Sequence, residues 1–112
     1  MSVSKRNDGI WIIDADRKTL FANEPMCTIL GVQASALIGS DSFRYVFPED
    51  VEAAARLFAQ KKDGSFSPFR FRLRRQDGSP IWTDVQGNPM YNAAGEFMGI
   101  LGTFTVSDRQ QP

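Results

Sequence analysis

Three aspartates, Asp14, Asp16 and Asp50, are the side chains of this chain best suited to acid–base chemistry. The 112 residues contain no histidine and one cysteine, Cys27. This composition excludes Ser-His-Asp and Cys-His catalysis, zinc bound by histidine, and haem held by a proximal histidine. One thiolate also cannot form a cysteine-rich metal site. Since turns and a helix start account for all three aspartates, we expect no enzyme, and a small α+β enzyme is the less favoured alternative.

The charge of the chain is balanced, with 13 Lys and Arg against 13 Asp and Glu. A net charge of zero gives no general attraction to nucleic acid or to anionic membranes, so we expect neither as a partner. No apolar stretch approaches the ~20 residues that span a bilayer, and no signal peptide follows the first residues. We therefore expect this domain to be cytoplasmic, within a full-length protein that could itself be membrane-anchored.

The apolar pattern predicts a single α+β domain. Alternating or β-prone runs predict strands at residues 9–14, 19–23, 69–74, 81–85 and 97–106. Asn23 predicts the start of a short helix that ends at Gly31, and Pro48 opens a longer helix that ends at Gly64. We expect a five-stranded antiparallel sheet with the short helices packed on one face. The expected organisation is an N-terminal extension (1–8), the domain (9–106) and the start of a linker to an effector (107–112).

Eight short motifs occur in order along the chain: Asp8-Gly9-Ile10, Phe21-Ala22-Asn23, Leu30-Gly31, Leu37-Ile38-Gly39, Phe47-Pro48-Glu49-Asp50, Arg75-Gln76-Asp77-Gly78, Ile81-Trp82 and Gly99-Ile100-Leu101-Gly102. Together they resemble a PAS domain over about residues 8–109. The resemblance implies a noncatalytic sensor and protein-interaction domain of a signal-transduction protein. It also implies a covalently linked effector, such as a histidine kinase, a cyclase or a transcription regulator, and a cavity between sheet and helices.

Flavin and haem, two cofactors of this family, are not expected here. In the flavin-binding light sensors a cysteine stands three residues after the glycine that Gly39 resembles, and this chain has Ser42. Thr83 is the one polar residue on the predicted inner face of the last three strands, which would leave polar groups of a flavin unpaired. The haem-binding relatives use a histidine, and Phe47 also replaces the histidine that commonly precedes Pro-Glu-Asp. The remaining ligand class is a small metabolite.

The inner face of the sheet has two interpretations, a filled core and a small apolar pocket for an aromatic or fatty metabolite. In the second, Gly102 leaves room for the ligand, and Thr83 or Asn23 supplies a hydrogen bond. Asn23 has a competing role as the helix N-cap. The pocket candidates are Trp11, Ile13, Asn23, Phe43, Phe47, Phe58, Phe69, Phe71, Leu73, Thr83, Val85, Gly102 and Phe104.

The outer face carries three alternating arginines, Arg70, Arg72 and Arg74, opposite the strand that contains Trp82. This face is too apolar to be left in water, so we expect it to be covered or to form a homodimer. A ligand-free dimerisation module is accordingly the alternative function. The outer-face candidates are Ile10, Ile12, Arg72, Trp82 and Leu101. The expected exit of the signal is formed by Thr105, Ser107, Asp108 and Arg109, where many relatives have Asp-Ile-Thr.

Overall fold

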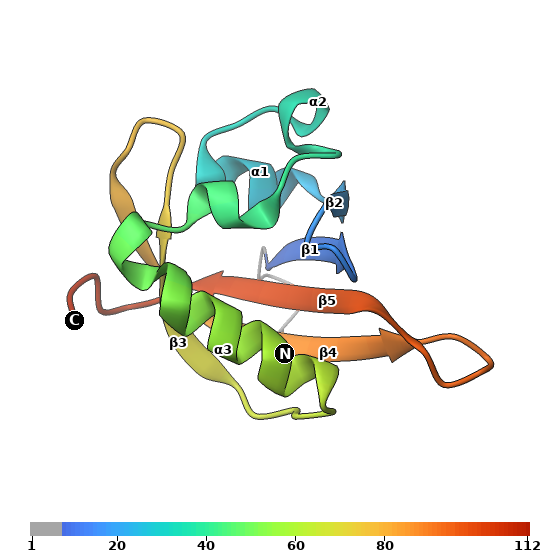
Figure 1. Cartoon of the computed structure of the whole chain (residues 1–112). Coiled ribbons are helices and arrows are strands. Elements are labelled where there is room, and N and C mark those ends of the chain that lie inside the picture. Colours follow the sequence, from blue (N-terminus) through green and yellow to red (C-terminus); the bar gives the residue numbers. More distant parts are fainter. Residues whose placement is uncertain (1–7) are drawn as a thin grey trace, which may run out of the picture.

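A five-stranded antiparallel sheet forms the body of the protein (Figure 1). The computed structural model describes residues 8–112. The strands are β1 (Gly9–Asp14), β2 (Thr19–Ala22), β3 (Phe69–Arg74), β4 (Pro80–Tyr91) and β5 (Phe97–Val106). Their order in the sheet is β2-β1-β5-β4-β3. The first hairpin therefore joins the later three strands through β1 and β5.

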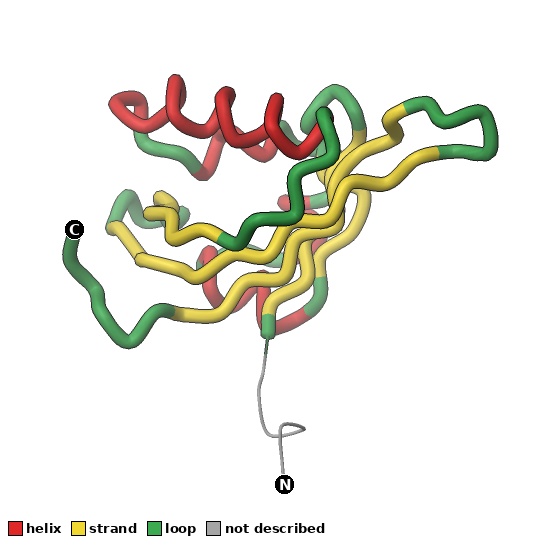
Figure 2. The backbone as a smooth tube through the Cα atoms, turned by 90° about the horizontal axis from the view of Figure 1, so that it is seen from below, coloured by secondary structure: helices red, strands yellow, loops and turns green. Residues whose placement is uncertain are grey.

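The helical segments lie between β2 and β3 in the chain. They are α1 (Glu24–Leu30), α2 (Ala34–Leu37), the 3-10 turns η2 (Ser42–Tyr45) and η3 (Pro48–Asp50), and α3 (Val51–Lys62). The longest, α3, lies along one face of the sheet (Figure 2). None of the helices in residues 8–112 has the length and apolar character needed to cross a membrane.

The sequence predicted both ends of α1 correctly. The Asn23 side chain accepts a hydrogen bond from the Met26 amide at 3.0 Å, and Gly31 ends the helix with φ 72°. The start of the longer helix differs from the prediction. Pro48 begins a 3-10 turn, and α3 starts only at Val51. The fourth strand is also longer than predicted. Gly87 and Pro89 interrupt its apolar alternation, but their pairing with β5 continues the strand to Tyr91.

The strand register confirms the two predicted faces. Arg70 lies opposite Asp84 and Arg72 opposite Trp82 in the β3–β4 pair, while Trp11 lies opposite Gly102 in the β1–β5 pair. The core forms on the inner face, where α1 and α2 pack against Trp11 and its neighbours. The buried residues of this cluster are Trp11, Ala22, Met26, Cys27, Ile29, Leu30, Leu37, Tyr45, Leu73 and Ile81.

Gly99 allows β5 to approach β1 closely. It lies opposite Asp14 with φ 146°, a backbone conformation that side chains disfavour. A Cβ at this position would lie 2.0 Å from the carbonyl oxygen of Ile13 and 2.9 Å from the Cα of Asp14. Because both contacts are with backbone, no side-chain rotation can relieve them.

We expect Gly99→Ala to lower the free energy of unfolding by about 3 kcal/mol or more, since it combines backbone strain with overpacking. Urea denaturation measures this loss. Gly95→Ala is the matched control. Gly95 also has a positive φ, 81°, but its Cβ would meet no non-neighbouring atom of the described residues within 4 Å, so its cost is about 1 kcal/mol. Equal losses in the two variants would contradict the close-approach explanation.

Candidate functional site

A cavity of about 120 Å³ lies between α3 and the inner face of the sheet. Its wall is almost entirely apolar and comes from β1, η2, α3 and strands β3 to β5. The lining residues are Trp11, Ile13, Ser42, Phe43, Val46, Ala54, Leu57, Phe58, Lys61, Phe69, Phe71, Leu73, Val85, Gly87, Ile100, Gly102 and Phe104. A cavity of about 150 Å³ can hold benzene, so this one suits a ligand of similar or smaller size.

Two glycines on neighbouring strands form part of the cavity wall. Gly87 on β4 pairs with Gly102 on β5. A Cβ on Gly102 would lie 2.7 Å from the Phe104 ring, and a Cβ on Gly87 would lie 3.2 Å from Cε of Lys61. The missing side chains thus give room to the Phe104 ring and to the aliphatic part of Lys61.

Two of the residues that line this apolar cavity are polar and buried. Lys61 is only 3% exposed, and its Nζ donates a hydrogen bond to the Ser67 carbonyl at 2.8 Å. The same Nζ lies 5.5 Å from the centroid of the Phe69 ring. Ser42 is 6% exposed, and its Oγ has no hydrogen-bond partner within residues 8–112. Burial lowers the pKa of the Lys61 ammonium from its ordinary value of 10.5.

Most of the pocket candidates lie around this cavity. Those at its wall are Trp11, Ile13, Phe43, Phe58, Phe69, Phe71, Leu73, Val85, Gly102 and Phe104. Their alternation on strands and helix predicted which face they share. That they bind a ligand stays a prediction.

Three pocket candidates lie elsewhere. Asn23 is the helix cap, and its Oδ1 also accepts a hydrogen bond from the Ile10 amide at 2.8 Å. Thr83 faces inward but is fully buried, and its hydroxyl donates to the Phe71 carbonyl at 2.9 Å. Phe47 packs under the guanidinium of Arg72, 4.4 Å from its ring centroid. None of the three lines the cavity, and their part in ligand binding stays a prediction.

Arg72 also departs from its predicted place. Its backbone register puts it opposite Trp82 on the outer face, but β3 is an edge strand and the long side chain reaches the helical layer. There it forms an ion pair with Asp50 at 2.7 Å and a weaker one with Glu49 at 3.4 Å. Arg72 therefore fastens the start of α3 to the edge of the sheet instead of forming part of an outer surface.

Sequence reasoning missed several cavity residues, namely Ser42, Val46, Ala54, Leu57, Lys61, Gly87 and Ile100. Lys61 suits the last turn of a helix by its charge, and nothing in the local pattern marks it as buried. Gly87 fell beyond the predicted end of its strand, although a glycine within a strand is a known sign of close approach by another group.

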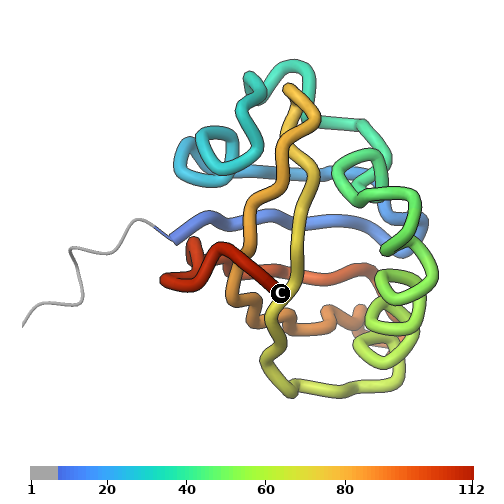
Figure 3. The backbone as a smooth tube through the Cα atoms, turned by 90° about the vertical axis from the view of Figure 1, so that its left-hand side faces the viewer, coloured from blue at the N-terminus to red at the C-terminus, as the bar shows by residue number. Residues whose placement is uncertain are grey.

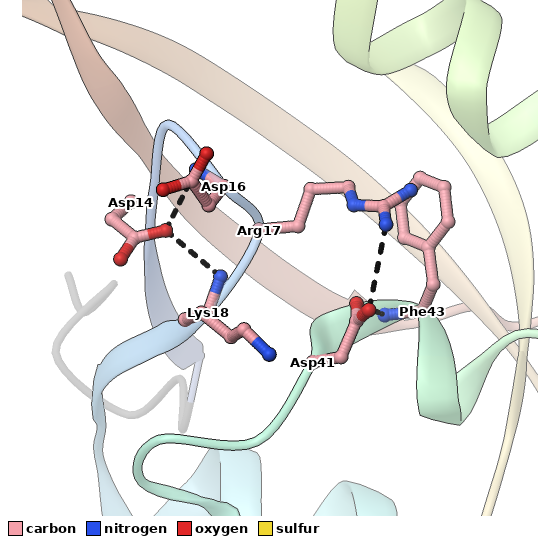
Figure 4. Close-up of polar contacts among 6 residues, drawn as sticks. All are labelled: Asp14, Asp16, Arg17, Lys18, Asp41 and Phe43. Carbon is pink, nitrogen blue, oxygen red and sulfur yellow. Dashed lines mark hydrogen bonds and ion pairs between the residues drawn. The ribbon is translucent and has the colours of Figure 1, made fainter.

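The aspartates that could have served acid–base chemistry have structural contacts (Figure 4). Oδ1 of Asp14 accepts hydrogen bonds from the backbone amides of Asp16 and Lys18 at 2.8 and 2.9 Å, which closes the β1–β2 turn. Asp16 is exposed beside it. Within residues 8–112, no group of three or more His, Cys, Asp or Glu side chains could hold a metal ion. Burial raises the pKa of the Cys27 thiol, with a smaller effect from Glu24.

The same turn holds one wall of the cavity in place. Arg17 has φ 68°, and its guanidinium pairs with Asp41 at 3.4 Å and lies 4.2 Å from the centroid of the Phe43 ring (Figure 4). Asp41 in turn accepts a hydrogen bond from the Phe43 amide at 2.9 Å. These contacts attach η2, which carries Ser42 and Phe43, to the β1–β2 turn.

The outer face retains an apolar row on the β2–β1–β5 side. Ile12 lies opposite Phe21 on β2 and opposite Leu101 on β5, and Phe21 is 48% exposed. Ile10 lies on the same face, two residues before Ile12. All four belong to the face that the sequence predicted to be covered.

The segment after β5 runs beside β3 and β4 (Figure 3). The Ser107 amide and the Gln110 side-chain amide both donate to the Trp82 carbonyl at 2.9 Å, and Oε1 of Gln110 accepts from the Trp82 amide at 2.8 Å. Arg70 lies 4.3 Å from the centroid of the Trp82 ring and donates to the carbonyl of Arg109. Trp82 is therefore held by the exit segment.

The other exit candidates differ in their surroundings. The Thr105 hydroxyl donates to the Asp8 carboxylate at 3.0 Å, and Oγ of Ser107 accepts from the Arg109 amide at 3.2 Å. Asp108 is exposed. The role of these residues in signalling stays a prediction.

Comparison with known proteins places this geometry in a family. Residues 4–106 match the PAS fold. Basic helix-loop-helix ARNT-like protein 2 of Gallus gallus is 31% identical over 81 residues, covering 71% of this chain and 12% of that protein. C4-dicarboxylate transport sensor protein DctS of Rhodobacter capsulatus is 30% identical over 93 residues, covering 80% of this chain and 14% of that protein. The chain thus spans a small part of these relatives.

Solved structures agree on the fold. The PAS domain of a protein from Colwellia psychrerythraea has a TM-score of 0.82 and 20% sequence identity, covering 89% of this chain and 86% of that chain. At this identity the likeness shows the architecture alone.

We expect Lys61→Met to raise the free energy of unfolding at pH 7 by about 1 kcal/mol, because an apolar side chain of similar length replaces a buried charge. The lowered pKa means that the unfolded chain binds the Lys61 proton more tightly than the folded chain. Wild-type stability therefore rises with pH between the lowered pKa and 10.5, and the difference from Lys61→Met shrinks over this range.

Urea denaturation across pH measures this trend. Lys62→Met, at the exposed neighbouring position, should show no such pH-dependent difference. A gap between wild type and Lys61→Met that stays constant up to pH 10.5 would contradict the desolvation of Lys61.

Proposed function

The chain belongs to the PAS fold family, and from this premise we propose that it is a noncatalytic sensor domain that binds a small apolar or aromatic molecule. PAS domains are sensor modules of signalling proteins and are in general not catalytic. The observation that carries the proposal is the apolar cavity between α3 and the sheet. Its aromatic wall and small size favour a compact metabolite over a large cofactor.

The proposed output runs through β4. This strand carries Gly87 at the cavity and Trp82 on the outer face, where Gln110 and Arg70 hold the exit segment. A ligand that shifts β4 against β5 would change these contacts and so the path of the chain after Ser107. The linker at residues 107–112, the attached kinase, cyclase or transcription effector, and the cytoplasmic location remain predictions.

We also propose that two copies associate through the apolar row on the outer face. Ile12, Phe21 and Leu101 form a continuous surface across three strands. The formal net charge of zero gives no long-range repulsion between copies. A second copy would cover this row on both partners at once. A dimer with an empty, unresponsive cavity is the alternative function, a ligand-free dimerisation module.

We expect Ala54→Leu to abolish binding of toluene, the neutral apolar probe for this cavity. Ala54 is buried on α3 at the cavity wall, so three added carbons would fill the space. NMR titration of wild type should shift the amide signals of Gly87 and Gly102, and the indole signal of Trp82 if β4 transmits the change.

Ala55→Leu is the control, because Ala55 is exposed on the same helix. It should bind toluene as wild type does. Absence of shifts in wild type, or equal shifts in Ala54→Leu, would overturn the binding proposal. Shifts at the cavity without any change at Trp82 would overturn the proposed output path.

We expect Ile12→Glu to convert the dimer to a monomer, since it places a charge in the centre of the apolar row. Sedimentation velocity over a range of concentrations measures the assembly. Ile38→Glu is the control at an exposed apolar position after α2. A monomeric wild type, or an Ile12→Glu variant that folds and still dimerises, would remove the homodimer from the proposal.

A further inference from the structure

Lys61 is a cation buried at the wall of an apolar cavity without a counter-ion in the described chain. Its side chain is only 3% exposed. Within residues 8–112, no carboxylate forms an ion pair with it, and the Ser67 carbonyl is its hydrogen-bond acceptor. An ammonium group carries three donors, so two N–H groups of Lys61 have no acceptor there. A buried ammonium in this state is destabilising unless an anion or further acceptors reach it.

The second buried polar side chain of the wall, Ser42, is also incompletely hydrogen-bonded. Oγ of Ser42 lacks a hydrogen-bond partner within the described residues, and it belongs to a different element, η2. Lys61 and Ser42 both belong to the wall of the cavity, and each side chain carries a hydrogen-bond donor. A group that only accepts hydrogen bonds and carries negative charge, such as a carboxylate, complements both.

The rest of the cavity wall determines the chemistry of the part of the ligand that lies away from Lys61. It is built from aromatic and aliphatic side chains, among them Trp11, Phe71 and Phe104. The volume of about 120 Å³ suits an apolar body of about the size of benzene. A ligand with several charges would leave the additional charges in this apolar wall without partners.

We propose that the cavity takes a small apolar monocarboxylate whose carboxylate pairs with Nζ of Lys61. This inference rests on the proposed function and narrows its ligand class. In the complex, the aromatic or branched aliphatic body of the acid fills the apolar cavity between α3 and the sheet, and its charge neutralises the buried ammonium. The lysine then selects the anion from neutral molecules of the same shape, which an apolar wall alone cannot do.

The test compares benzoate with benzamide, which has nearly the same shape but no charge, by NMR titration of the 112-residue chain at pH 7, where a simple carboxylic acid is ionised. Wild type should bind benzoate at least about tenfold more tightly than benzamide. Lys61→Met should lose this preference and still bind benzamide. Lys62→Met, which removes an exposed charge from the neighbouring position, should keep the preference.

The outcomes separate this inference from the function on which it rests. Equal binding of the two probes by wild type, or a benzoate preference that persists in Lys61→Met, overturns the carboxylate assignment and leaves the apolar binding site. A wild type that binds neither probe and also fails to bind toluene overturns the binding function itself, and the ligand class with it.

Discussion

The cavity depends on α3, which is fastened to the sheet and its loops near both ends and forms one wall of the cavity between them. At its start, Asp50 is paired with Arg72 of the edge strand. Towards its end, Phe58 packs edge-on against Phe97 at 5.7 Å, and Lys61 bonds to the loop before β3. Between these points the Phe104 ring lies over Gly102 and the stem of Lys61 lies over Gly87. If the Arg72 pair were lost, α3 could settle toward the sheet and the space would close.

The two interpretations of the inner face each describe one part of the domain. Below α1 and α2 the interior is filled, and Met26, Leu30 and Leu37 are completely buried. Below α3 the interior is hollow. The two helices differ in how their side chains are buried, because Met26 and Leu30 of α1 are completely enclosed, while Ala54, Leu57, Phe58 and Lys61 of α3 line the cavity. The filled half therefore packs in the same way whether or not the cavity is occupied, and a bound ligand would add its own stabilisation to the fold.

The fold could be predicted almost completely because local signals agreed with one another. The Asn23 cap, the Gly31 stop and the alternation of β3 each required only neighbouring residues. The site was predictable only where it followed that alternation, as for Phe71 and Val85. Prediction of the site failed where a long side chain reaches around the edge of the sheet to the opposite layer, as that of Arg72 does. It also failed where tertiary packing buries a charge, as for Lys61. No local pattern records either event.

Strand β4 links the two ends of the proposed output path, because Lys61 of α3 lies against Gly87 of this strand and the strand also carries Trp82. Gly87 contacts the stem of Lys61, and five residues earlier on β4 the backbone of Trp82 is bonded to Gln110. Any ligand that draws the ammonium away from the Ser67 carbonyl also moves the stem that lies against Gly87. The strand is stiff along its axis, since β5 pairs with it from Thr83 to Tyr91. On the proposed path, a displacement at the cavity would reach the exit segment through one strand, without rearrangement of the filled half of the core.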